Sequence, residues 1–407
     1  MAKLRIKNVG PIKQGYESNN GFITINNVTI FIGNQGSGKS TIAKIYSTLS
    51  WIEKALVRGD FTPSYLTQYN RFKKQLAYQN IGNYLSNESE IEYIGEAYRF
   101  EFKRNKLTIN NIQENKYKFP KIMYVPAERN FVSSVERPDL IKRLPLPLYT
   151  FLDEYEEAKK NYTESIDLPI GNIKFEYRKQ NKKSWLIGPD FKIELLEASS
   201  GFQSFIPLFL VTKYLSKIID NRENNTHREI SIEEERKIRQ EVDKLFANKN
   251  ISEDIRRVLL EKLSARFKYS CFINIVEEPE QNLYPSSQKE VLFDLLESKN
   301  KEKENRLIIT THSPYIINYL TLAIKGDLIK RKVKNNPELL DKLKLIVPLA
   351  STIHSDAVSI FQLDNNGIIK TLENYNGLPS DENYLNEFLA ESNDLFVKLL
   401  EIEDLCQ

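Results

Sequence analysis

Apolar and polar positions alternate in two different ways near the start of the chain. Residues 4–7, 22–25 and 28–32 are rich in apolar side chains and are separated by Gly, Pro and Asn, which predicts short strands. From Lys39 to about Ala55 apolar residues return every three or four positions, which predicts a helix. The chain therefore begins with strands that lead into a helix.

Both patterns recur further along the chain. Helices are expected over residues 63–85, from Gly201 onwards, over about 287–296 and from about Asp381. The segments 272–276 and 307–310 are mostly apolar, as in parallel strands buried on both faces. These features indicate an α/β fold. Further strands are expected at 91–94, 98–102, 106–109, 122–125, 174–177, 184–187, 191–195, 358–363 and 367–371.

One short segment carries the strongest chemical signal. After the strand 28–32 the chain reads Gly33-Asn34-Gln35-Gly36-Ser37-Gly38-Lys39-Ser40-Thr41, which matches G-x-x-x-x-G-K-[ST] in full. The glycines let successive N–H groups surround a phosphate, and the helix N-terminus adds partial positive charge. Lys39 is expected to reach the β- and γ-phosphates and Ser40 to ligate Mg²⁺. The segment predicts a nucleoside-triphosphate site.

Acidic side chains and a histidine follow the two apolar strands. Glu277 and Glu278 stand after the strand 272–276, at the sheet edge where ligands collect in α/β folds. Glu277 is expected to hold the Mg²⁺ shell, and Glu278 to orient or deprotonate the attacking water. His312 follows the other strand and is expected to hydrogen-bond the γ-phosphate or that water. A solvated acidic turn and a structural histidine are the alternatives.

Composition excludes several classes of protein in which such a site could occur. Of 407 residues 41% are hydrophobic, which suffices for a substantial core, and 58 Lys and Arg against 55 Asp and Glu give a net charge of +3. That charge is too small for a protein that coats nucleic acid. The two cysteines cannot form a disulfide scaffold, and the three histidines have no zinc spacing. With no signal peptide and no apolar run of ~20 residues, we expect a cytoplasmic protein without membrane partners.

The order of phosphate loop, acidic strand and strand-end histidine resembles that of the ABC-type ATPases. Between them, Ser199-Ser200-Gly201-Phe202-Gln203-Ser204 resembles the signature loop L-S-G-G-Q, with Phe202 in place of the second glycine. In that family the loop contacts the γ-phosphate of ATP held by a second subunit. The resemblance implies ATP and Mg²⁺ as cofactors, a homodimer or higher homo-oligomer, and ATP contacts from Ser200, Gly201 and Gln203.

Further motifs resemble the RecF, SMC and OLD branch of AAA-type ATPases. Residues 6–12 resemble its N-terminal strand and turn, 277–285 its E-E-P-E-x-x-L-x-P stretch, and 311–314 its T-H-S-P. This implies an ABC-type P-loop ATPase head with a mixed central sheet, an antiparallel β subdomain and helical insertions. Residues 124–130 occupy the place of the family's Q-loop but have no glutamine at the end of the strand. In one interpretation Glu128 replaces that glutamine or Arg129 contacts phosphate. In the other, these residues form a structural salt bridge.

The spread of the motifs bears on domain organisation. Because residues from Gly33 to His312 must meet in space, residues 1–407 are expected to form a single domain, with helical insertions at about 55–90, 135–170 and 219–268. The last insertion is dense in charge, with helical spacing around 230–246 and 255–263. A solvated face is its default interpretation, and a partner-binding surface is the alternative.

Two functions from different classes fit this resemblance. The gaps between motifs lack the sustained heptads of long coiled-coil arms, and nothing after His312 resembles an OLD-type nuclease. The chain then resembles the stand-alone ATPase subunits of bacterial anti-phage defence systems of the PARIS and Septu kind, which act with a separate effector nuclease or toxin. The alternative is a RecF-like repair ATPase that clamps duplex DNA, for which the basic stretches 178–183 and 325–334 are candidate contacts.

Overall fold

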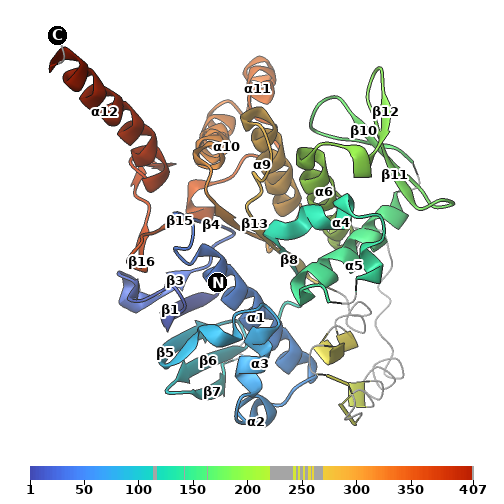
Figure 1. Ribbon diagram of the computed structural model, residues 1–407, viewed down its shortest axis with the longest axis vertical. Coiled ribbons are helices and arrows are strands. Elements are labelled where there is room, and N and C mark those ends of the chain that lie inside the picture. The colour runs from blue at the N-terminus through green and yellow to red at the C-terminus, as the bar shows by residue number, and fades with distance from the viewer. Residues whose placement is uncertain are drawn as a thin grey trace.

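The computed structural model describes residues 1–112, 117–141, 143–162, 164–220 and 269–405, together with 242–243, 246–247, 251–252, 255–257 and 259–260. The expected α/β architecture, with a mixed central sheet, is confirmed (Figure 1). Most of the helical spacing expected within 230–246 and 255–263 lies outside the described residues, as do His227 and Cys406.

The central sheet has seven strands in the order β2-β16-β15-β4-β14-β13-β8. The pairs that join β15, β4, β14, β13 and β8 are all parallel, and β16 runs antiparallel to β15. The carboxyl ends of the parallel strands therefore share one edge of the sheet. The strands are β2 (Gly15–Tyr16), β4 (Val28–Gly33), β8 (Pro120–Val125), β13 (Cys271–Glu277), β14 (Arg306–Thr311), β15 (Val358–Leu363) and β16 (Ile368–Thr371).

Both faces of this sheet are covered, which explains why its central strands are mostly apolar and do not alternate with polar residues. Val28, Ile30 and Ile32 of β4 belong to a core shared with helices on one face. Phe31, which points the other way, belongs to a core shared with α1 and a second sheet. The helices are α1 (Lys39–Arg58) on the second face, and α5 (Leu146–Asn161), α6 (Ser200–Asp220), α9 (Pro285–Asn300) and α10 (Pro314–Lys332) on the first.

The second sheet is antiparallel, with the order β3-β1-β5-β6-β7, and confirms the expected β subdomain. The expectation of one helical stretch over 63–85 is wrong in part. Two short helices occupy its first half, and Asn70 between them takes a left-handed φ of 61°, which interrupts the helix. The bounds are β1 (Lys3–Val9), β3 (Ile23–Thr24), α2 (Pro63–Leu66), α3 (Arg71–Ala77), β5 (Leu85–Ile94), β6 (Tyr98–Lys103) and β7 (Lys106–Asn111).

The remaining elements lie around the helical face. Within the stretch 135–170, α5 occupies residues 146–161, and a small antiparallel sheet of order β12-β11-β10-β9 follows this helix. The sequence patterns above do not include α10 or α11, although the buried residues of α10 have helical spacing. The bounds are α4 (Phe131–Ser134), β9 (Ile166–Asp167), β10 (Lys174–Arg178), β11 (Lys183–Ile187), β12 (Lys192–Glu194), α11 (Pro337–Lys344), β17 (Asn374–Tyr375), β18 (Leu378–Pro379) and α12 (Tyr384–Leu405).

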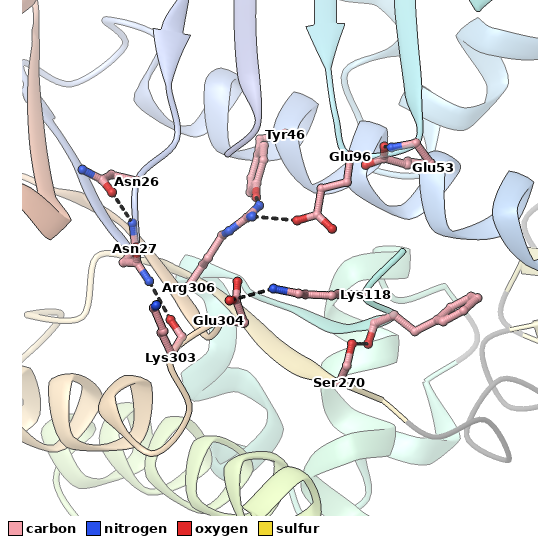
Figure 2. A network of polar contacts seen from close by, with 12 residues as sticks. Asn26, Asn27, Tyr46, Glu53, Glu96, Lys118, Ser270, Lys303, Glu304 and Arg306 are labelled. Carbon is pink, nitrogen blue, oxygen red and sulfur yellow. Dashed lines mark hydrogen bonds and ion pairs between the residues drawn. The ribbon is translucent and has the colours of Figure 1, made fainter. Parts of the chain in front are cut away.

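The amino edge of the central sheet carries a network of paired polar groups (Figure 2). Arg306, at the start of β14, donates to the Tyr46 hydroxyl at 3.4 Å and to Glu96 Oε1 at 3.0 Å. The ammonium group of Lys118 lies 2.7 Å from Glu304 Oε1. These contacts join the antiparallel sheet and α1 to the strand starts. None of the helices in the described part of the chain is long and apolar enough to cross a membrane.

Candidate functional site

The phosphate-loop sequence forms a tight turn from β4 to α1, at the carboxyl edge of the central sheet. Gly33, Gly36 and Gly38 have positive φ angles of 143°, 78° and 108°. A Cβ at Gly33 would lie 2.3 Å from the carbonyl oxygen of Leu363, so any other residue would collide with β15. The loop is thereby fixed against its neighbouring strand. The turn and the first helical residues also contain Asn34, Gln35, Ser37, Ser40 and Thr41.

Lys39 is the first residue of α1 and is 4% exposed. Its Nζ donates to the carbonyl oxygens of Gly33 and Asn34, each at 2.8 Å, and lies 3.5 Å from Nδ1 of His312. Burial lowers the pKa of Lys39 to about 8, although nearby glutamates oppose the shift. Within the described part of the chain its ammonium group has no ion pair. A buried cation at this place suits an anionic ligand.

Glu277 is the last residue of β13 and is 4% exposed. Its Oε2 accepts from the backbone N–H of Ala127 at 3.3 Å, whereas its Oε1 is buried without a hydrogen-bond partner. Such an unpartnered oxygen is costly. Because Mg²⁺ prefers oxygen ligands, this carboxylate fits the metal role expected from the sequence.

Glu278 and His312 face each other beside the loop. Oε1 of Glu278 lies 3.4 Å from Nε2 of His312, whose Nδ1 is the atom near Lys39. The contact with His312 lowers the pKa of Glu278, against the effect of burial. Glu278 also has a left-handed φ of 44°, which is uncommon outside glycine and recurs at functional sites. The structure thus brings Lys39, Glu278 and His312 into one row.

Glu280 is a site residue for which the sequence patterns gave no role. Its buried Oε1 accepts from the Thr311 hydroxyl and from the backbone N–H of His312, both at 2.7 Å. Its Oε2 is buried without a partner, and burial raises its pKa. The side chain fixes the histidine's backbone. The only sign of this residue in the sequence is the last acid of the E-E-P-E stretch. The sequence does not show where its side chain points, because that depends on the turn after β13.

Arg129 is fully buried, and the contacts of its guanidinium match neither interpretation of this segment. Its guanidinium donates to the carbonyl oxygens of Glu277 and Glu278, each at 2.7 Å, and its Nε donates to that of Ser204 at 3.2 Å. These are structural contacts to backbone oxygens rather than a salt bridge. Glu128, its neighbour, is exposed. Arg129 therefore links the end of β13 to the first turns of α6.

The signature-like segment begins α6. Ser200 is exposed, and Gly201 is buried so close to the 277–285 stretch that a Cβ would lie 2.8 Å from the Asn282 carbonyl oxygen. The Gln203 amide donates to the carbonyl oxygens of Leu195 and Leu196, at 3.3 and 2.8 Å. In the described residues no hydrogen bond or ion pair joins Ser200, Gly201 or Gln203 to the phosphate loop.

A proline lies inside the same helix. Pro207 has no N–H to donate to the carbonyl oxygen of Gln203 one turn earlier. The Ser133 hydroxyl of α4 donates to that oxygen instead, at 2.5 Å. The first turn of α6 is therefore held from outside the helix.

Comparisons with known proteins place this geometry in a family. Residues 28–318 match the model of a family described as "AAA domain, putative AbiEii toxin, Type IV TA system". No curated protein gives a match.

Solved structures with a similar outline include an SMC head bound to the C-winged helix domain of ScpA, at 10% identity and TM-score 0.37, covering 91% of this chain and 96% of that one. The SMC head domain from Thermotoga maritima gives 11% identity and TM-score 0.36, covering 92% and 98%. A dimeric post-hydrolysis ATP-binding cassette bound to ADP and phosphate gives 11% and 0.31, covering 92% and 100%. At such low scores these likenesses carry no functional conclusion.

Proposed function

Because the chain belongs to the family of AAA domains described as "AAA domain, putative AbiEii toxin, Type IV TA system", we propose that it binds and hydrolyses ATP as a subunit of a bacterial defence or toxin complex. The observation that carries the ATPase proposal is the row of Lys39, His312 and Glu278 beside a complete phosphate loop. The family's description supports a role in a toxin system, and the proposed control of a separate effector nuclease or toxin rests on the sequence resemblance alone.

ATP binding would use the loop and its buried cation. The N–H groups of Gly33 to Thr41 would surround the phosphates, and Lys39 would exchange its two carbonyl contacts for phosphate oxygens. Ser40 and Glu277 would hold Mg²⁺, since Glu277 Oε1 has no partner within the described structure. The metal would neutralise charge on the β- and γ-phosphates.

Hydrolysis would use Glu278 as the general base. The contact with His312 lowers its pKa, so Glu278 is a carboxylate at neutral pH and can hold and orient the attacking water. His312 would hold this carboxylate through Nε2 and direct its other ring nitrogen toward the γ-phosphate beside Lys39. Glu280 would position His312 through its backbone N–H.

A second copy would complete the site. Ser200 is exposed at the N-terminus of α6, with no hydrogen bond to the phosphate loop of its own chain among the described residues. A helix N-terminus attracts anions, so it is suited to the γ-phosphate of ATP held by another copy. We therefore propose an ATP-dependent homodimer or higher oligomer in which Ser200 and Gly201 act in trans.

Four of the nine basic side chains in the stretches considered for DNA have a polar partner in the described structure. In 178–183, Arg178 pairs with Glu176 and Lys183 with Glu194. In 325–334, Arg331 pairs with Asp327, and Lys330 donates to the carbonyl oxygen of Leu349. The remaining lysines of both stretches keep the charge that a clamp would need for phosphate, so the two proposals are separated by the experiment below and not by these contacts.

The test of the ATPase proposal is Glu278→Gln, which removes the base while keeping its size. ATP hydrolysis should fall roughly 10²-fold or more, while ATP binding persists and ATP-dependent association, followed by light scattering, becomes more stable. Glu338→Gln, on exposed α11, is the matched control and should leave turnover unchanged. Normal turnover in the Glu278 variant would exclude it as the base.

The test of the biological role is what the ATP-bound Glu278→Gln protein retains. A stable complex with a nuclease or toxin encoded beside it supports the defence proposal. Duplex DNA bound only with ATP, and lost steeply with salt, would instead support the repair clamp.

A further inference from the structure

The helix α12 differs from every other long helix in the described structure, because it projects from the body (Figure 1). At its start Leu385 packs against the main core. From residue 393 to residue 404 every side chain is exposed. The exposed set includes large apolar residues that are 44% to 62% accessible: Leu395, Phe396, Val397, Leu399, Leu400 and Ile402.

The apolar positions of α12 form a seam. The sequence positions 385, 388, 392, 395, 399 and 402 follow alternating steps of three and four, and all but Ser392 are apolar. This spacing is typical of a helix that packs along another helix with the same repeat. An apolar seam of this kind is unstable in water, so it indicates a partner helix.

The flanks of this seam carry different chemistry. Glu391 and Lys398, of opposite charge and seven residues apart, lie along one flank, and Phe396 and Glu403 lie along the other. In a parallel pair of identical helices, Lys398 of one copy would meet Glu403 of the other, but Glu391 would meet Phe396 and lack a cation. In an antiparallel pair each flank meets its own kind, so Glu391 would face Lys398 of the second copy.

We propose that α12 is an interface for the α12 of a second copy, packed antiparallel across a two-fold axis near Asp394. In this register Leu395 and Leu399 of each copy enter the seam of the other. The pair of Glu391 with Lys398 forms twice, once on each side of the axis. An interface of this kind closes on itself at two copies.

This interface is separate from the ATP-dependent association proposed above. It uses no residue of the nucleotide site, so it should hold two copies together without nucleotide. Lys39→Ala should abolish ATP binding and leave the α12 interface intact. Failure of one proposal therefore leaves the other standing.

The first experiment measures the mass of the nucleotide-free full chain against concentration, by sedimentation equilibrium. We expect a dimer whose dissociation constant rises roughly 10²-fold in Leu399→Asp, because a charge enters the seam. Val397→Asp, on the opposite side of α12, is the matched control and should change it little. A monomer at all concentrations, or a dimer insensitive to Leu399→Asp, would overturn the interface.

The second experiment tests the orientation. Glu391→Lys and Lys398→Glu should each weaken the dimer roughly tenfold, because each places like charges opposite one another. A mixture of the two variants should restore the original affinity, since each copy then carries one sign only. Circular dichroism would confirm that both variants fold. Single variants without effect, or a mixture that stays weak, would overturn the antiparallel arrangement.

Discussion

The two edges of the central sheet both collect charged side chains, but they differ in how these charges are matched. At the amino edge Arg306 meets Glu96, and Lys118 meets Glu304 (Figure 2). At the carboxyl edge Lys39 has no ion pair among the described residues, and Glu277 and Glu280 each keep a buried oxygen without a partner. Matched charges stabilise the fold, whereas unmatched buried charges favour a ligand that completes them.

The largest effect should come from breaking the matched edge. Arg306→Met should destabilise the protein by about 3 kcal/mol, because Glu96 and the Tyr46 hydroxyl lose a largely buried donor. Urea denaturation measures this, and the ATPase rate per folded molecule should be unchanged. Lys342→Met, in an exposed pair with Glu338, is the control. A loss below about 0.5 kcal/mol would contradict the structural role given to this edge.

The same kind of substitution at the unmatched edge should have the opposite sign. Lys39→Met should stabilise the nucleotide-free protein by about 2 kcal/mol. Burial lowers the pKa of Lys39, which means that folding costs free energy to bury its charge, and methionine removes that cost. Thermal melts without ATP measure the gain, and nucleotide titration should show that ATP affinity is lost. Lys44→Met, one turn along α1, should do neither. A destabilised Lys39 variant would remove the contrast between the edges.

A pH-dependent effect should sharpen the comparison. Burial raises the pKa of Glu280, so the wild type loses stability as pH rises from the ordinary glutamate value through the raised one. Glu280→Gln keeps the acceptor for Thr311 and His312 and has no charge to bury. It should therefore be more stable by about 1 kcal/mol at neutral pH and equal at acid pH. Urea denaturation from about pH 4 to pH 8 measures this difference in the free energy of unfolding. If burial did not raise the pKa of Glu280, the difference would be the same at every pH.

The smallest effect should come from an exposed pair at the matched edge. The side chains of Lys118 and Glu304 are 47% and 42% accessible, so water screens their attraction. Lys118→Met should change the free energy of unfolding by about 0.5 kcal/mol or less. A loss as large as that expected for Arg306→Met would mean that exposure does not rank the pairs of this edge.

Local patterns were enough for much of the fold and for the centre of the site. The strands before Lys39, Glu277 and His312 are apolar runs whose ends must share an edge in a parallel sheet, so their convergence could be predicted. The break at Asn70 could not, because it depends on one left-handed residue within otherwise helical spacing. Domain organisation as a single unit stays a prediction.

The supporting residues were harder to predict for a physical reason. Arginine is rarely buried, so no pattern marks Arg129 as a residue that binds backbone oxygens in the interior. Glu280 is placed by the turn after β13 and by the neighbouring strand, which are contacts across the fold. Sequence spacing identifies groups that meet a ligand more readily than groups that hold them in place.

The proline in α6 has a mechanical consequence. Because Pro207 removes a rung of the hydrogen-bond ladder, the first turn of α6 can tilt relative to the rest of the helix without breaking it. The Ser133 hydroxyl donates to the carbonyl oxygen of Gln203 in that turn, and Arg129 donates to that of Ser204 and also to those of Glu277 and Glu278. A displacement at the end of β13 would therefore be transmitted through Arg129 to the first turn of α6 and would move the exposed Ser200.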